Sequence, residues 1–238
     1  MMRIALFLGL ALAACSPPSA GAPAAATMSF PKPDRPVAEI VSPIWSSGPD
    51  RDEADEAGQV ARGLGITAGM AVADIGAGSG YHTVRLAKVV GPTGRVYAQD
   101  VMADYLAELR QEIAARGLTN VEVVLGTADD PKLPPTSVDR AILVHMYHEI
   151  AQPYGLMWNL VPALRPGARV GIVDLDRRPE RHGTPPSLLK CEVEAVGYRQ
   201  TGFIQLKGGV GYMAVFEPPA VDRRPAPGSI KPCRLGGD

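Results

Sequence analysis

Two stretches of the chain combine residue types that could bind a ligand and move protons. The first runs from Asp74 to Gly80 and contains Gly76 and Gly78 as well. Glycine lets the backbone turn sharply and approach a ligand without a Cβ in the way. An apolar run precedes this stretch and a helical pattern follows it, so the free amides that open the helix could receive a polar or anionic group. The stretch therefore predicts a ligand-binding loop between a strand and a helix.

The second stretch runs from Val144 to Ile150 and gathers two histidines, a tyrosine and a glutamate. Histidine titrates near pH ~6.5, which suits a proton acceptor at neutral pH. We expect His148 to act as a base or to orient a substrate, with Tyr147 and Glu149 in support. The alternative is that these side chains cap the following helix or bond to loop backbone.

A metal site is not expected from these residues. His145 and His148 lie three residues apart and Glu149 is adjacent, but no further ligand is evident, and zinc-protease signatures order these residue types differently. Three other polar residues fall where ligands could bind: His82 after the glycine loop, Asp174 at the end of an apolar run, and His182 in the loop 177–186.

Short apolar runs alternate with longer amphipathic segments in the middle of the chain. The runs are mostly rich in Val or Ile and are flanked by Gly, Pro or Asp, which is typical of strands buried in a parallel sheet. They are Met70–Ile75, Arg95–Gln99, Val121–Leu125, Val138–Val144 and Arg169–Asp174. The expected helices are Tyr81–Val90, Met102–Arg116 and Ala151–Leu164. This alternation predicts an open parallel sheet whose ligands bind at the carboxyl ends of the strands.

The spacing of the glycines separates two classes of cofactor. A nicotinamide dinucleotide fingerprint, G-x-G-x-x-G, would need its third glycine at position 81, where Tyr81 stands. A nicotinamide oxidoreductase is therefore disfavoured. The observed G-x-G-x-G, with Asp74 two residues before the first glycine, resembles motif I of the class I S-adenosylmethionine-dependent methyltransferases.

The resemblance continues in register along the chain. Asp100 follows the second apolar run and matches the family's acidic residue, which implies a carboxylate that accepts bonds from both ribose hydroxyls. After the third run, Asp129 matches the family's contact to adenine, with Asp130 as the alternative. The segment Leu164–Val170 is similar to the family's turn into its fifth strand, although Ala168 stands where a second glycine is usual.

The resemblance implies a fold, a cofactor and a reaction. The implied fold is α/β, a three-layer Rossmann-like seven-stranded sheet that is mostly parallel with an antiparallel last strand. The implied cofactor is S-adenosyl-L-methionine, and methyl transfer from its sulfonium is a displacement in which positioning supplies much of the acceleration. The implied cofactor-binding residues are Asp74, Gly76, Gly78, Gly80, Asp100 and Asp129.

Composition favours a small-molecule acceptor over nucleic acid. The formal net charge is -1, aromatic residues make up only 5%, and no run of Lys and Arg forms a basic stripe. Neither electrostatic attraction to phosphates nor a base-stacking platform is therefore indicated.

The first residues read as a targeting signal. A short apolar stretch within residues 1–14 ends in Leu-Ala-Ala before Cys15, which resembles a bacterial lipobox. This resemblance implies cleavage before Cys15, lipidation of that cysteine, and anchoring to the membrane of the cell envelope, facing the periplasm. A plain secretory signal is one alternative. Translation from Met28, which would leave the protein in the cytoplasm, is another.

Proline distribution predicts the domain boundaries. More than half of the 23 prolines fall in residues 1–50 and 218–238. We expect a tether at 15–36, a folded domain at 37–217 and a disordered tail at 218–238.

Two observations leave alternatives open. Cys191 and Cys233 could pair in an oxidising compartment, or Cys191 could be a small core residue. An exported methyltransferase would also be separated from a donor made in the cytosol, so a non-catalytic envelope lipoprotein that reuses the fold is a second hypothesis.

Overall fold

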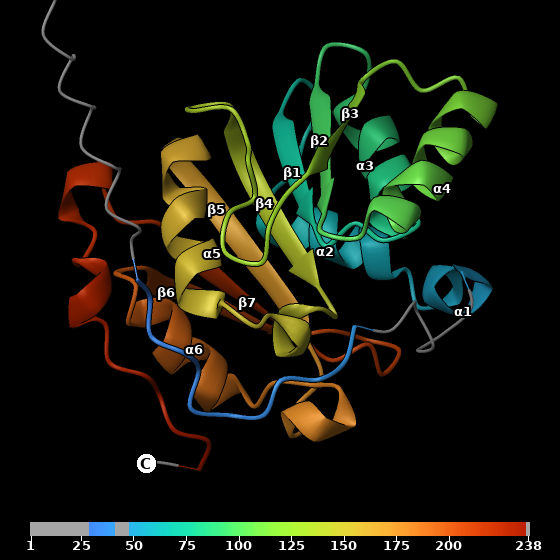
Figure 1. The fold of residues 1–238 in the computed structure, drawn as a ribbon. Helices are drawn as coiled ribbons and strands as arrows, with labels where there is room; N and C mark the ends of the chain where they lie inside the picture. Colours follow the sequence, from blue (N-terminus) through green and yellow to red (C-terminus); the bar gives the residue numbers. More distant parts are fainter. Residues whose placement is uncertain (1–28, 41–47, 237–238) are drawn as a thin grey trace, which may run out of the picture.

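The computed structural model describes residues 29–40 and 48–236 and forms one seven-stranded sheet, ordered β3-β2-β1-β4-β5-β7-β6. Figure 1 shows this sheet at the centre of the chain. The strands are β1 (Ala71–Ile75), β2 (Arg95–Asp100), β3 (Val121–Leu125), β4 (Val138–Val144), β5 (Leu164–Asp174), β6 (Arg199–Gln205) and β7 (Tyr212–Glu217). Strands β1 to β5 pair in parallel, and β7 is antiparallel to both β5 and β6. The predicted fold class is confirmed.

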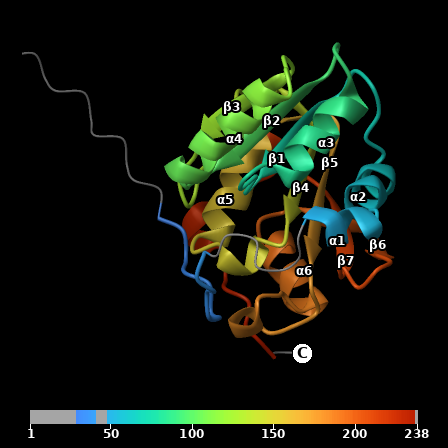
Figure 2. The ribbon, with the colours of Figure 1, turned by 90° about the vertical axis from the view of Figure 1, so that its right-hand side faces the viewer.

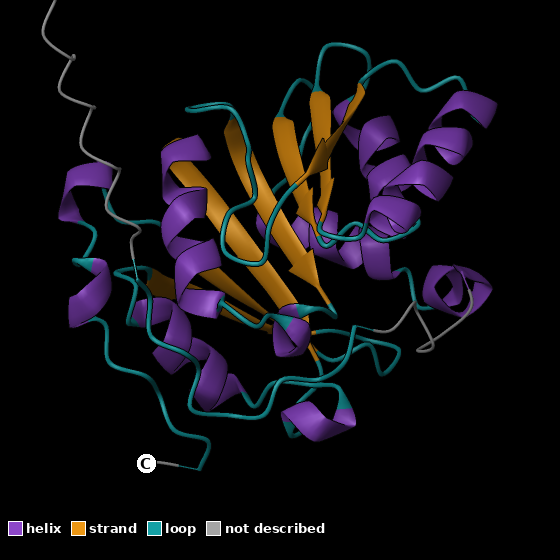
Figure 3. Ribbon diagram, in the orientation of Figure 1, coloured by secondary structure: helices purple, strands orange, loops and turns teal. Residues whose placement is uncertain are grey.

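Helices cover both faces of the sheet and make three layers, as the purple helices and orange strands of Figure 3 show. The helices are α1 (Gly48–Glu53), α2 (Glu56–Leu64), α3 (Tyr81–Val90), α4 (Ala103–Ala115), α5 (Pro153–Leu160) and α6 (Pro186–Glu194). Helices α2, α3 and α4 pack on one face, and α5 and α6 on the other. Figure 2 views the molecule with α3 and α4 towards the reader.

Alternation along the strands builds a core on each side of the sheet. Ile142 of β4 packs with α2 and α3, whereas the next residue, Leu143, packs with α5 and α6. Successive strand residues point to opposite faces, so a strand covered on both sides must be apolar at every position. All five residues of β1 are buried for this reason.

Element ends follow the expected chemistry, with two adjustments. Helix α4 ends before Gly117, which has a φ of +64° and donates its amide to the carbonyl of Ala114, as a glycine stop should. Helix α5 ends at Leu160, earlier than expected, because Pro162 has no amide to continue the ladder. Strand β5 begins earlier than expected, at Leu164, since that residue pairs with Val138.

The described parts of the proline-rich ends, residues 29–40 and 218–236, pack against the rest of the fold. Within the expected tether, the side chain of Arg35 is fully buried. Within the expected disordered tail, Ile230 and Cys233 are buried, and the carbonyl of Pro225 accepts a bond from Trp158. Proline content indicated a lack of regular structure, which is different from a lack of packing. The expected signal at 1–14 and Cys15 lie outside the described residues.

A disulfide joins Cys191 of α6 to Cys233 of the C-terminal segment, with a Cα–Cα distance of 6.0 Å. The amide of Cys233 also donates to the hydroxyl of Tyr154 in α5 at 2.8 Å. The C-terminal segment is therefore held to the face of the molecule that α5 and α6 form. Of the two alternatives for Cys191, the structure shows pairing.

Removing this disulfide is expected to destabilise the fold substantially. The bond closes a loop with a sequence separation of 42, for which loop-closure entropy predicts about 4 kcal/mol of stabilisation. The double variant Cys191→Ser/Cys233→Ser should lose about that much unfolding free energy in urea titrations. Wild-type protein in excess dithiothreitol should show the same loss. Equal urea midpoints for oxidised and reduced protein would show that the bond contributes nothing.

Candidate functional site

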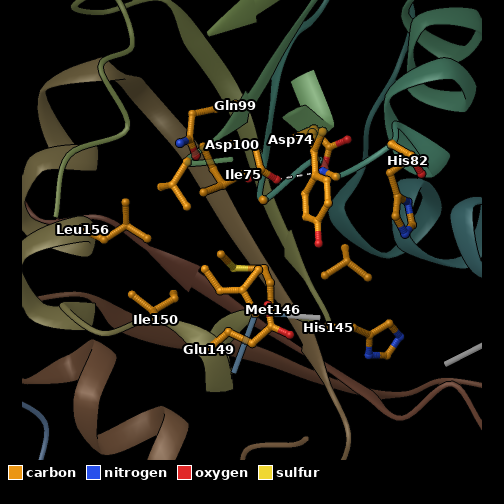
Figure 4. Close-up of a pocket in the computed structure, with 18 of the residues that line it drawn as sticks. Asp74, Ile75, His82, Gln99, Asp100, His145, Met146, Glu149, Ile150 and Leu156 are labelled. Carbon is orange, nitrogen blue, oxygen red and sulfur yellow. Dashed lines mark hydrogen bonds between the residues drawn. The ribbon is translucent and has the colours of Figure 1, made fainter. Parts of the chain in front are cut away.

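An open cavity lies at the carboxyl ends of β1, β2 and β4. Figure 4 shows Asp74, Gln99 and Asp100 on one side of it, and Met146, Glu149 and Ile150 on the other. The main lining segments are residues 74–79, 99–101, 127–128, 144–146 and 149–151. This is the edge at which parallel sheets bind their ligands.

The glycine loop forms one wall of the cavity, and its three glycines differ in what surrounds them. Gly76, Gly78 and Gly80 have φ values of +71°, +54° and +95°, a region that L side chains rarely adopt. Gly76 and Gly78 line the cavity, and a Cβ at Gly78 would meet nothing within 4 Å. Gly80 does not line it; a Cβ there would collide with the side chain of Leu109 in α4. The absence of a side chain at Gly80 therefore lets α4 pack against the loop.

Asp100 is fixed at the end of β2 by the glycine loop itself. Its Oδ2 accepts the amide of Gly78 at 2.9 Å, and its Oδ1 accepts the amide of Met102 at 2.9 Å. The residue is only 6% exposed and lines the cavity. A carboxylate has about four lone-pair sites, so both oxygens can still accept a bond from a ligand hydroxyl. The loop and this carboxylate thus form a single preorganised wall.

Asp74, at the end of β1, is a buried carboxylate on the same wall. Its Oδ2 accepts the hydroxyl of Thr83 at 2.6 Å. Burial raises the pKa of Asp74 above its ordinary value, while the nearby His82 and the Thr83 bond oppose that rise. A cationic or hydrogen-bond-donating ligand would stabilise the charged form of such a desolvated carboxylate.

The loop after β3 differs from the expectation. Thr127 and Ala128 line the cavity, whereas Asp129 does not. The Oδ1 of Asp129 accepts the hydroxyl of Thr127 at 2.8 Å, and Asp130 pairs with Lys132. Neither Asp129 nor its alternative Asp130 lines the cavity, so their expected contact to adenine stays a prediction.

The segment after β4 separates the three residues expected to act together. Glu149 lines the cavity, but Tyr147 and His148 do not. The segment is the 3-10 helix η1 (Tyr147–Glu149), in which side chains three residues apart share a side. Met146 and Glu149 therefore both face the cavity, and the two residues between them are turned into the interior.

Both interior side chains contact residues from elsewhere in the chain. The ring of Tyr147 lies beneath the guanidinium of Arg35, at 5.7 Å from the ring centroid. The Nδ1 of His148 lies 3.0 Å from an oxygen of Asp174. A base at His148 in direct contact with a cavity ligand is therefore not supported.

A buried ionic cluster flanks the cavity and was not predicted. Glu56 of α2 lies with one oxygen 2.9 Å from Nε2 of His82 and 2.6 Å from Arg51, and its other oxygen is 3.7 Å from Nε2 of His145. Burial alone would raise the pKa of Glu56, but its bonds from His145, His82 and Arg51 hold that pKa well below the ordinary value. The sequence offered no signal for Glu56, which lies far from the recognised motifs.

Acidification is expected to destabilise the protein through His82. Burial lowers the pKa of His82 in the folded protein, although Glu56 opposes this. The unfolded chain takes up that proton near pH ~6.5, whereas the folded protein resists it. Stability is therefore retained above pH ~6.5 and lost as the pH falls below it, by at most ~1.4 kcal/mol per pH unit.

Urea unfolding of wild type and His82→Gln at pH 7.5, 6.5 and 5.5 checks this expectation. Glutamine can still donate to Glu56 but does not titrate, so the variant should show a shallower loss of unfolding free energy between pH 6.5 and 5.5. Parallel pH profiles would assign the acid sensitivity to other groups.

Comparison with known proteins agrees with this geometry. Residues 72–167 match a family model described as a methyltransferase domain. A protein-L-isoaspartate O-methyltransferase of Methanothrix thermoacetophila is 29% identical over 109 residues, which cover 46% of the chain and 49% of that relative. A ubiquinone/menaquinone biosynthesis C-methyltransferase UbiE of Hahella chejuensis is 27% identical over 114 residues, 48% of the chain and 46% of that relative. The chain thus spans about half the length of the curated relatives it matches.

Solved structures match over more of the chain. A SAM dependent methyltransferase from Aquifex aeolicus superimposes with a TM-score of 0.65 at 26% identity, covering 71% of this chain and 92% of that one. The [4+2]-cyclase SpnF superimposes with a TM-score of 0.62 at 14% identity, covering 74% and 86%. The chain has the Rossmann-like fold that these proteins share.

Proposed function

We propose that the chain, whose residues 72–167 match a methyltransferase-domain model, transfers a methyl group from S-adenosylmethionine to a small-molecule acceptor. The observation that carries the proposal is the single wall made by the glycine loop and Asp100 at the carboxyl edge of the sheet. A carboxylate there can accept both ribose hydroxyls, and Gly78, where a Cβ would meet nothing within 4 Å, leaves room for the cofactor beside the backbone.

The opposite wall supplies the acceptor side. Met146 packs directly on the loop, because a Cβ at Gly76 would lie within 3 Å of its side chain, and a cofactor whose ribose bound Asp100 would meet this wall with its other end. Ile150 and Leu156 add apolar surface, and Glu149 is the acidic side chain on that wall. These features suit a small, largely apolar acceptor with one nucleophilic atom.

The transfer itself needs few groups. When bound, the cofactor would supply an electrophilic methyl group: the acceptor atom would attack it, the sulfur–methyl bond would break, and S-adenosylhomocysteine would leave with the electron pair. A proton lost by the acceptor passes to Glu149 or to solvent. The structure supports Glu149 in this role better than His148, because only Glu149 lines the cavity.

Calorimetry on the purified chain tests the cofactor assignment. We expect S-adenosylmethionine and S-adenosylhomocysteine to give saturable heats, and NADH to give none. A folded protein that binds neither sulfur compound would favour the non-catalytic hypothesis. Heat from NADH alone would favour an oxidoreductase.

We further propose that the protein is exported and anchored through Cys15. The lipobox-like sequence before Cys15 and the Cys191–Cys233 disulfide support this, because disulfides persist in oxidising compartments. Among the described residues, no helix is both long and apolar enough to cross a bilayer. Palmitate labelling that is lost in Cys15→Ser is the expected result. An unlabelled product that begins at Met28 and fractionates with the cytosol would contradict it.

A further inference from the structure

We propose that His148, Glu149 and His182 together bind one divalent transition-metal ion, with zinc as the best match. The three residues each offer a ligand atom, and these atoms lie within 4.8 Å of one another. Nε2 of His148 is 3.9 Å from Oε1 of Glu149. The rings of His148 and His182 meet edge to face, with centroids 5.5 Å apart.

The orientation of His148 is the first argument for the site. Its Nδ1 lies 3.0 Å from Oδ2 of Asp174, which also accepts the hydroxyl of Thr184 at 2.7 Å. The other oxygen of Asp174 accepts the amide of Leu175 at 2.8 Å. A carboxylate that receives these donors acts as an acceptor towards His148 too, which places the imidazole proton on Nδ1 and the lone pair on Nε2.

That lone pair accepts no hydrogen bond from the part of the chain that the structure describes. The side chain of His148 is 1% exposed, and its Nε2 has no hydrogen-bond partner among the described residues. A buried polar nitrogen without a partner costs free energy, and most such atoms in proteins are satisfied. A carboxylate on one imidazole nitrogen and a metal ion on the other is the usual arrangement of a metal-ligating histidine.

The backbone brings the distant ligand to the same place. His182 follows the 3-10 helix η3 (Pro179–Arg181) with a φ of +54°, a conformation that non-glycine residues seldom adopt. The bond from Thr184 to Asp174 pins this loop beside His148. Strained backbone of this kind persists where surrounding contacts hold it, and it concentrates at functional sites.

The ligand set indicates the class of metal and its open position. Two imidazoles and one carboxylate suit zinc, and three protein ligands leave a fourth position for a small molecule. In a tetrahedral zinc site the ligand atoms lie roughly 3.3 Å apart, so binding requires modest inward rotation of the side chains. Because Glu149 also lines the cavity, the fourth position would face it; with the ion bound, Glu149 is a ligand and a proton lost by the acceptor passes to solvent. A role for the ion in holding the methyl acceptor there rests on the proposed function; metal binding does not.

The sequence did not reveal this site because its third ligand is distant in the chain. His145 and Glu149 are neighbours of His148 in sequence, but His145 belongs to the Glu56 cluster. His182 comes from the loop after β5, and the expectation that no metal binds was made without it.

Calorimetric titration of the chelator-treated full chain with zinc tests the proposal. We expect one zinc per chain with a dissociation constant below about 1 µM, and at least a hundredfold weaker binding in His182→Gln and in Glu149→Gln. The remaining two histidines provide matched controls, so His82→Gln and His145→Gln should bind zinc as wild type does. Circular dichroism establishes that each variant is folded. His148 is not the main test, because substituting a fully buried residue can unfold the protein.

The spectrum of bound cobalt provides a second readout that does not depend on activity. Cobalt should give the visible bands of a four-coordinate site with nitrogen and oxygen ligands, and His182→Gln should remove them. A folded chain that binds no zinc at 1 mM, or zinc binding that survives in His182→Gln, overturns the metal site. S-adenosylmethionine should bind both with and without zinc. A chain that binds no S-adenosylmethionine in either state would count against the proposed function and not against the metal site.

Discussion

Substituting Asp100 by asparagine is expected to weaken S-adenosylmethionine binding by between tenfold and a hundredfold. The substitution removes a charge from the carboxylate that would accept the ribose hydroxyls, and bonds to charged groups contribute about 1.5–3 kcal/mol each. It also puts an amide where the carboxylate now accepts donors from Gly78 and Met102, which disturbs the glycine loop. Both effects weaken binding, and calorimetry measures their sum.

Asp129→Asn is the matched control for this substitution. Asp129 does not line the cavity and its carboxylate bonds to Thr127, so the variant should bind the cofactor within about twofold of wild type. A strong loss in Asp129→Asn with tight binding retained in Asp100→Asn would reverse the assignment. It would mean that the adenosyl group binds at the loop after β3, through Asp129, and not at Asp100.

Substituting Arg35 by methionine is expected to destabilise the protein by about 3–5 kcal/mol. Nε of Arg35 donates to Glu192 at 3.0 Å, and both side chains are fully buried. Removing one partner of a buried ion pair leaves the other charge without compensation, which typically costs that amount. Burial already raises the pKa of Glu192, and Arg35, with a smaller contribution from Tyr147, opposes that rise. Urea unfolding monitored by circular dichroism measures the loss.

Two further variants show whether burial of the pair is the cause. Arg35→Met/Glu192→Leu removes both charges and should recover part of the lost free energy. Recovery should be incomplete, because Arg35 also donates to the carbonyls of Tyr147 and His148. Arg234→Met breaks an exposed pair with Asp34 and should change stability by at most about 0.5 kcal/mol. A similarly small effect of Arg35→Met would mean that residues 29–40 contribute nothing to the fold.

The same Arg35 contacts connect stability to the site. Residues 29–40, drawn in blue in Figure 1, run past α6 to the edge where the strands end. The amide of Ala38 donates to the carbonyl of His148 at 3.0 Å, and Ile40 lines the cavity. This segment therefore holds η1 from outside, and we expect Arg35→Met to alter the position of Glu149 as well as the unfolding free energy.

Local signals in the sequence determined the framework of the protein. Apolar runs with turn residues at their ends located the strands, because a strand buried on both faces must be apolar throughout. The glycine pattern at 76–80 located the tight loop, because only glycine accepts its backbone angles. Together with Asp100, these features lie within short stretches of chain or in register along it. They predicted five parallel strands and one wall of the cavity, whereas the seven-stranded sheet was implied only by the family resemblance.

Tertiary contacts decided what no local pattern encodes. Three features join residues that are far apart in sequence. They are the packing of residues 29–40 and 218–236, the Cys191–Cys233 disulfide, and the contacts of Glu56 with His82 and His145. The division of the 145–149 segment was also invisible, because a 3-10 turn instead of a loop turned His148 inward and left Glu149 on the cavity. The physical reason is common to these cases: the identity of a residue sets which bonds it can make, but the folded chain sets which partners come within reach.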